Sequence, residues 1–119
     1  MTEETQGELS ENQAEFVKLL YETAGTLKEM FESGNGELIG KLNKTVKQMY
    51  HVQRDSKEDV MQLITPDCEV LYKNVDMMTA VLRTTENGVI DDGARKAIGK
   101  FLHNINEAVV NIATVFGLV

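Results

Sequence analysis

Apolar side chains recur at helical spacing along four successive segments of the sequence, and this periodicity most limits how the chain can fold. Residues three and four positions apart lie on one face of an α-helix. Glycine and asparagine separate the segments at 33–36 and 87–88, and the chain has a single proline, Pro66. The sequence therefore predicts an all-α fold, an antiparallel up-and-down bundle of four main helices.

The first two segments have recognisable ends. Ser10 followed by Gln13 is typical of a capping box that opens a helix, and glycines and asparagine at 33–36 end it. The apolar face of this first helix contains Phe16, Leu20, Leu27 and Phe31. A second helix is expected from about Glu37 to Arg54, and its apolar face contains Leu38, Leu42, Val46, Met49 and Val52.

The third segment contains Pro66, which allows two interpretations. Proline removes the hydrogen bond to the carbonyl of Gln62, so Thr65 would cap a new helix with Pro66 in its first turn. Alternatively, one long helix is kinked there, because the apolar phase continues from Val60 to Leu82. The unbroken phase favours the kink, and both interpretations give the same layer of the bundle.

Acidic and hydroxyl side chains predict where the last two segments begin. Asp55 or Ser56 is expected to cap the third, and Asp91 or Asp92 the fourth, since such side chains suit a helix N-terminus. The core face of the fourth helix contains Ala94, Ile98, Phe101, Ile105, Val109, Ile112 and Phe116.

The length of 119 residues predicts one domain, with residues 1–9 as a flexible acidic tail and 10–119 as the helical bundle. Cys68 is the only cysteine, so no internal disulfide is available. The polar N-terminus has no signal-peptide pattern, and no run approaches the ~18 apolar residues of a membrane span. We therefore expect an intracellular, by default cytoplasmic, protein.

Charge is unevenly distributed along a chain whose net charge is −7. Residues 1–37 contain nine acids and two bases, and residues 38–57 contain one acid and five bases. Residues 58–92 contain eight acids and two bases, and residues 93–119 contain one acid and three bases. This alternation favours consecutive helices as neighbours, and the net charge argues against nucleic-acid or membrane binding through the whole surface.

The stretch "TENGVIDDG" at 85–93 resembles the middle of an EF-hand calcium loop. With Gly88 as the sixth loop residue, the first position holds Arg83 and the last holds Ala94. Calcium needs an acidic first ligand and a bidentate glutamate last, so the resemblance fails where ligands are required. The stretch predicts a helix end followed by acidic caps, and no metal or other cofactor is expected.

Signatures of catalysis are missing from the sequence. It contains no glycine-rich phosphate loop, GxSxG or HExxH motif. Cys68 lies among acidic residues, which disfavour its thiolate, and a buried small side chain is expected there. His51 and His103 are expected to be solvated. These features predict a protein that is not an enzyme.

Two groups of residues are the first candidates for binding. Lys44, Lys47, His51 and Arg54 share the polar face of the second helix, flanked by Tyr50, and suit either phosphates or an acidic partner. Five methionines fit core packing or an adaptable cavity: Met30, Met49, Met61, Met77 and Met78.

A third candidate is the C-terminal segment, where the apolar arc of the last helix widens beyond Ile105. An outer helix of a small bundle needs a narrower apolar face. The excess predicts either core burial or an interface with a homodimer or hetero-partner, formed by Val110, Val115, Phe116 and Leu118.

Three glycines, Gly25, Gly40 and Gly99, fall inside predicted helices, where each costs ~1 kcal/mol relative to alanine. Close approach between helices is the expected reason for them.

The leading functional hypothesis is a non-enzymatic protein–protein interaction module, such as a small subunit, adaptor or inhibitor that presents helix faces. The first alternative is a nucleic-acid- or regulator-associated factor that uses the basic face, although the acidity of the chain makes nucleic acid the less expected partner. The second is a small-ligand-binding bundle with a methionine-lined cavity.

Overall fold

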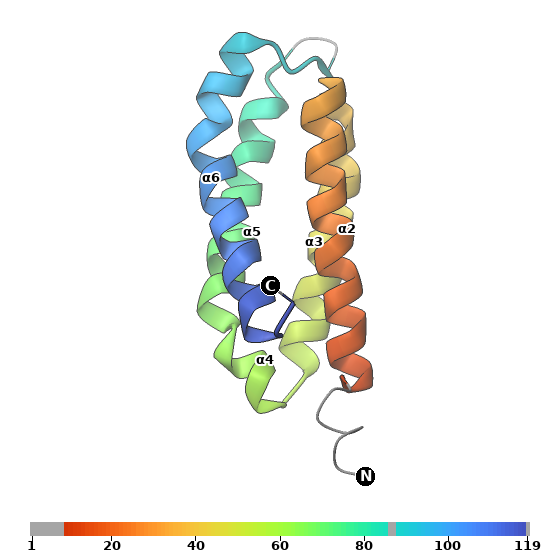
Figure 1. The fold of residues 1–119 in the computed structure, drawn as a ribbon. Coiled ribbons are helices and arrows are strands. Elements are labelled where there is room, and N and C mark those ends of the chain that lie inside the picture. Colours follow the sequence, from red (N-terminus) through yellow and green to blue (C-terminus); the bar gives the residue numbers. More distant parts are fainter. Residues whose placement is uncertain (1–8, 86–87, 119) are drawn as a thin grey trace.

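A computed structural model describes residues 9–85 and 88–118 as a helical bundle (Figure 1). Five α-helices and one short 3-10 helix occur in this part of the chain, and it contains no β-strand. They are α2 (Glu11–Ser33), η1 (Gly36–Leu38), α3 (Ile39–Asp55), α4 (Asp59–Leu63), α5 (Thr65–Leu82) and α6 (Asp92–Val115). The all-α prediction is confirmed. The predicted acidic tail lies outside the described residues except for Leu9.

Two antiparallel hairpins pack side by side to form the bundle. Figure 1 shows α2 paired with α3 and α5 paired with α6, with both hairpin turns at one end and the start of α2 and the end of α6 toward the other. Each long helix packs mainly against two neighbours: α2 and α5 each contact α3 and α6. The predicted up-and-down order is therefore confirmed.

The core runs through the bundle and draws side chains from every helix. The largest fully buried side chains are Phe16, Leu20, Met30, Leu42, Met49, Met61, Ile64, Leu71, Met78, Ile98, Ile105 and Ile112. Four of the five methionines are thus core residues, where a flexible thioether fills irregular space. The fifth, Met77, is only partly buried and lies in a groove between α5 and α6.

Two of the predicted helix starts are confirmed by their hydrogen bonds. The Ser10 hydroxyl accepts from the Gln13 amide at 3.1 Å, and the Gln13 side chain accepts from the Ser10 amide at 3.3 Å. The Asp91 carboxylate accepts from the Ala94 amide at 2.8 Å and so caps α6. Each bond satisfies an amide that the first turn leaves without a helical partner.

The third segment begins differently from the prediction. The Ser56 hydroxyl accepts from the Glu58 amide at 3.2 Å, which closes a tight turn before α4. The helix itself starts at Asp59 without a side-chain cap. Ser56 is buried in this turn, so its hydroxyl satisfies the turn rather than the helix.

The structure divides the third segment into two helices, α4 and α5, with Ile64 between them, so the single kinked helix that the apolar phase favoured is wrong. Pro66 lies in the first turn of α5, where the missing amide would have no helical partner in any case. Thr65 does not cap α5; its hydroxyl donates to the Met61 carbonyl at 3.2 Å. Ile64 and Cys68 both remain buried, so the apolar phase continues across the break.

The turns of the two hairpins contact each other at one end of the bundle. The Ile90 amide donates to the Gly34 carbonyl at 2.9 Å, and Asn35 and Val89 form an isolated antiparallel bridge. Arg95 donates to the Phe31 carbonyl at 2.7 Å, near the C-terminal end of α2. We call residues 34–36 and 88–90 the paired turns. They join the two hairpins through backbone contacts in addition to the core, to which Ile90 contributes its side chain.

Glycine is required at the closest point of the paired turns. A Cβ on Gly36 would lie 2.8 Å from the carbonyl oxygen of Gly88, and Gly88 itself has φ of +65°. The Gly88 carbonyl leaves no room for a methyl group at position 36. The positive φ of Gly88 disfavours any other residue at position 88. Each hairpin turn therefore needs its glycine for a different reason.

The explanation expected for the three helical glycines is wrong. Gly25, Gly40 and Gly99 are exposed, and a Cβ built on any of them would meet nothing within 4 Å. No neighbouring helix approaches them, because each lies on the outward side of its own helix. The fold therefore carries their conformational cost without a packing gain.

We predict that Gly25→Ala and Gly99→Ala each raise the free energy of unfolding by ~1 kcal/mol, because alanine has the higher helix propensity and space is free. Urea unfolding followed by circular dichroism measures the change. Gly36→Ala is the matched control, and it should destabilise the protein because its methyl group meets the Gly88 carbonyl. Stabilisation by Gly36→Ala would contradict the geometry of the paired turns.

Candidate functional site

The predicted basic residues form one exposed row on α3. Lys44, Lys47, His51 and Arg54 are spaced three, four and three residues apart, and all four side chains are exposed. This spacing keeps them on one side of a helix. We call these four residues the basic stripe.

Few of these charges are used by the fold. Between described residues, ion pairs join Arg54 to Asp55 at 3.3 Å and His103 to Glu107 at 3.3 Å. The Asp55 carboxylate raises the pKa of Arg54, whose guanidinium also lies 5.5 Å from the centre of the Tyr50 ring. Lys44 and Lys47 have no carboxylate partner in the described part of the chain.

A groove of about 390 Å³ lies beside the basic stripe, between α3 and α5. Tyr50 and Tyr72 meet edge to face in it, with ring centres 5.8 Å apart. Lys47 lines the groove from α3, and Asp76 lines it from α5 without an ion pair between them. Asn43 and Val46 complete the lining, and we call this feature the α3–α5 groove.

Hydrogen bonds between α3 and α5 hold the groove in shape. Gln53 donates to the Thr65 hydroxyl at 3.0 Å and accepts from the Tyr72 hydroxyl at 3.4 Å. Asn43 donates to the Thr79 hydroxyl at 2.8 Å. Burial raises the pKa of Tyr72, so its hydroxyl stays a neutral donor. A groove fixed in this way needs little ordering when it binds a partner.

The residues contributed by α5 were not anticipated from the sequence. Tyr72 and Asp76 are four positions apart, on the flank of the apolar face of their helix. The spacing shows that they share a side, but only the packing of α3 against α5 brings Tyr72 to Tyr50. The sequence therefore indicated which residues share a side of each helix, but it did not indicate that these two sides pack together.

The four residues of the predicted C-terminal interface are not equivalent. Val110 is 52% exposed and Val115 is 37% exposed. Phe116 and Leu118 are partly buried and pack on the core, with the Phe116 ring centre 5.9 Å from that of Phe16. The two valines are five positions apart in the sequence, so they lie about 140° apart around α6.

The end of α6 explains why Leu118 folds back. Gly117 has φ of +73°, and its amide donates to the Thr114 carbonyl at 3.0 Å. The Leu118 amide donates to the Ala113 carbonyl at 2.8 Å. These two bonds form a Schellman motif, which places an apolar side chain back against its own helix.

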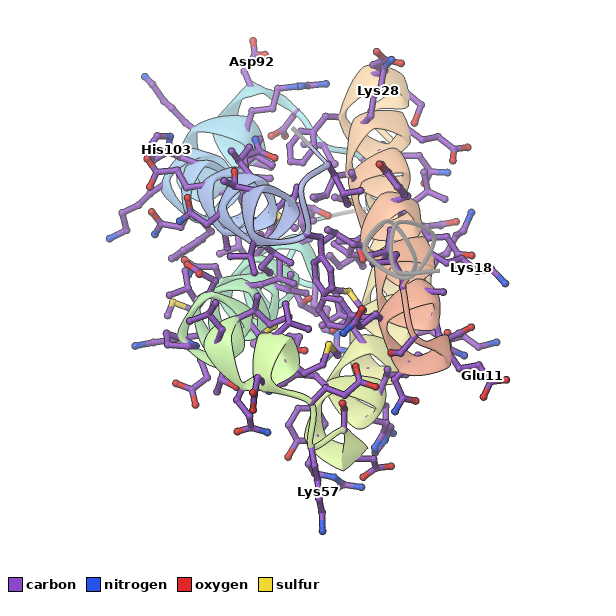
Figure 2. The ribbon with its side chains drawn as sticks, turned by 60° about the horizontal axis from the view of Figure 1, so that its bottom comes forward. Glu11, Lys18, Lys28, Lys57, Asp92 and His103 are labelled. Carbon is purple, nitrogen blue, oxygen red and sulfur yellow. The ribbon has the colours of Figure 1, made fainter. Side chains whose placement is uncertain are left out.

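The remaining titratable residues are dispersed. His103 lies 3.3 Å from Glu107, and both are exposed on α6. His51 is on α3, at the opposite corner of the bundle. Figure 2 shows that the labelled Lys18 and Lys28 project outward from α2, and His103 from the far side. Within residues 9–85 and 88–118, no three His, Cys, Asp or Glu side chains gather as a metal site would require.

Glu86 and Asn87 of the calcium-like stretch lie outside the described residues. No helix in the described part of the chain is long and apolar enough to cross a membrane.

No family model matches the sequence, and neither a curated protein nor a solved structure matches it. The class of protein is therefore defined by the fold alone, a four-helix bundle with an added short helix.

Cys68 is fully buried, as expected, although the main cause of its high pKa is burial rather than the neighbouring acids. Burial raises the pKa of this thiol to about 12, with smaller contributions from Asp67 and Glu69. The folded state therefore keeps the thiol protonated well above its ordinary pKa, and the reactive thiolate is scarce.

We predict that a thiol reagent labels Cys68 at pH about 8 only in molecules that have unfolded. The rate of labelling should therefore equal the rate at which unfolding exposes the thiol. Stability should fall as pH rises above the ordinary thiol pKa, because the unfolded state then loses a proton that the folded state retains up to pH about 12. Ellman's reagent with and without urea measures the labelling. Fast labelling of the folded protein would contradict this burial.

Proposed function

We propose that the protein is a non-enzymatic interaction module that binds an acidic segment of a partner protein. The binding surface is the basic stripe on α3 together with the adjoining α3–α5 groove. The observation that supports the proposal most strongly is the exposed row of cationic side chains on a chain whose net charge is −7.

The fold supplies no structural reason for the two lysines of this row. Lys44 and Lys47 are exposed and unpaired among the described residues, and exposed charges contribute little to stability. Like charges along one helix face repel each other, so the row costs a small amount of stability in isolation. An acidic partner would remove that repulsion.

The aromatic groove supplies the second element of a protein interface. Tyrosine and arginine are enriched among the residues that dominate binding energy. Tyr50 is 43% exposed and is contacted by both Arg54 and Tyr72. A partner side chain entering the groove would bury an aromatic surface that is already held in place.

An acidic protein segment fits this surface better than nucleic acid. Asp76 lines the far side of the groove, so anionic groups are favoured only along the α3 side. The adjacent helix α2 is acidic, and a long polyanion extending across it would be repelled. A short acidic segment aligned with α3 avoids both.

The C-terminal interface formed by Val110, Val115, Phe116 and Leu118 stays a prediction. The positions of these side chains favour Val110 as its exposed member, since Phe116 and Leu118 pack on the core. The methionine-lined cavity receives no support from Met30, Met49, Met61 and Met78, which are fully buried core side chains.

We predict that reversing the basic stripe abolishes binding and preserves the fold. The variant is Lys44→Glu, Lys47→Glu and Arg54→Glu, and the probe is a fluorescein-labelled helical peptide with glutamate at i, i+4 spacing. Its affinity, measured by anisotropy, should fall at least ~10-fold, while surface charges cost only ~0–1 kcal/mol each in stability.

A charge-matched variant controls for net charge. Three Lys or Arg to Glu changes lower the net charge by two each, from −7 to −13, wherever they are made. The control changes three exposed lysines on α5 and α6: Lys73→Glu, Lys96→Glu and Lys100→Glu. Equal loss of binding in both variants would refute the α3 site. Tighter binding of single-stranded DNA than of the peptide would favour the nucleic-acid alternative.

A further inference from the structure

Helix α2 carries an acidic row that is somewhat longer than the basic stripe. Glu15, Glu22 and Glu29 are exposed and repeat every seven residues, which keeps them on one side of the helix. Lys18, also exposed, lies on the same side between Glu15 and Glu22 and is the one cation in the row. They span about 21 Å along the axis, and Lys44 to Arg54 spans about 15 Å. We call these three glutamates the acidic stripe.

The two stripes lie on one hairpin and at the same height. Helices α2 and α3 are antiparallel neighbours, and the Thr23 hydroxyl donates to the Met49 sulfur at 3.2 Å. Counting about 1.5 Å per residue from this contact, Glu22 lies near the height of His51 and Glu29 near that of Lys44. No ion pair between described residues joins the two stripes.

This arrangement is self-complementary under one symmetry operation. The twofold axis runs parallel to the helices, in front of the α2–α3 hairpin. It places α2 of each copy against α3 of the other, and every residue keeps its position along the helix axis. Each acidic stripe then faces a basic stripe, twice in one interface, as a twofold contact requires. An axis perpendicular to the helices would instead face α2 with α2, which juxtaposes like charges.

We propose that the acidic partner of the basic stripe is a second copy of this chain, docked through its acidic stripe in a twofold dimer. This inference rests on the proposed function, because it uses the basic stripe, without the α3–α5 groove, and names its occupant. In the dimer, Glu29 of one copy faces Lys44 of the other, and Glu22 faces the region of Lys47 and His51. The same count places Arg54 at the height of Lys18, so the attraction comes from the half of the hairpin nearer the paired turns. Opposite charges at these positions fix orientation and register.

Two exposed glycines are compatible with this dimer. Gly25 lies between Glu22 and Glu29 on the outward side of α2, and Gly40 precedes Lys44 by one turn on α3. A Cβ on either would meet nothing within its own chain, so both leave room for a second helix to approach. Gly99 lies on α6, away from this hairpin, and the dimer does not explain it.

The test is sedimentation velocity on the full chain over a range of protein and salt concentrations. The wild-type protein should dimerise near 0.05 M salt and dissociate near 0.5 M, because the Debye length falls from roughly 14 to 4 Å. A wild-type chain that is monomeric at all concentrations at low salt would overturn the dimer. An association that salt leaves unchanged would overturn it too.

Charge-swap variants test the proposed pairing directly. One variant reverses the basic stripe and the other reverses the acidic stripe, with Glu15→Lys, Glu22→Lys and Glu29→Lys. Each alone should raise the dimer dissociation constant at least ~100-fold, and an equimolar mixture should restore a heterodimer, because both contacts again join opposite charges. A mixture that remains monomeric while both variants are folded would refute the pairing.

The outcomes separate this inference from the proposed function. If the wild-type chain is monomeric but the acidic peptide still binds the basic stripe, the dimer is wrong and the interaction module stands. If neither association occurs, both are wrong. If a single-stripe variant fails to fold by circular dichroism, the chain with both stripes reversed is used instead. It should regain the wild-type dimer, and failure to do so counts against the pairing.

Discussion

Neither hairpin of this protein can bury its apolar face alone, and this mutual dependence underlies the rest of the structure. Short helices gain most of their stability from packing rather than from propensity. Here Phe16 and Met30 of α2 and Leu42 of α3 share one core cluster with residues of the second hairpin, such as Ile105. The core therefore specifies the bundle, and the outward sides of the helices remain available for other tasks.

The paired turns add a directional constraint to this non-directional packing. Apolar contacts alone permit one hairpin to slide along the other, whereas the Ile90 to Gly34 hydrogen bond fixes their ends together. The close approach of Gly36 to Gly88 leaves no slack at this point. With the register set there, Tyr50 and Tyr72 meet at a fixed place between α3 and α5.

Periodicity predicted the helices well because they depend on neighbours in sequence, whereas the caps expected of Asp55 or Ser56 and of Thr65 do not form. Ser10 and Asp91 were identified by local chemistry, and both cap their helices. Features that need two distant segments were missed, such as the bridge between Asn35 and Val89 and the contribution of Tyr72 to the groove. The basic stripe was visible because it lies on one helix. Its neighbouring groove was not, because it lies between two.

We propose that the apolar core folds the chain and leaves the charges of the α2–α3 hairpin free for binding. The most direct measurement is the free energy of unfolding of the monomer, at low protein concentration, as a function of salt. Screening removes surface attractions and repulsions alike. We expect the free energy of unfolding to change by less than ~1 kcal/mol between low and high salt, or to rise slightly. A loss of several kcal/mol would show that these charges hold the fold together, and would contradict the claim.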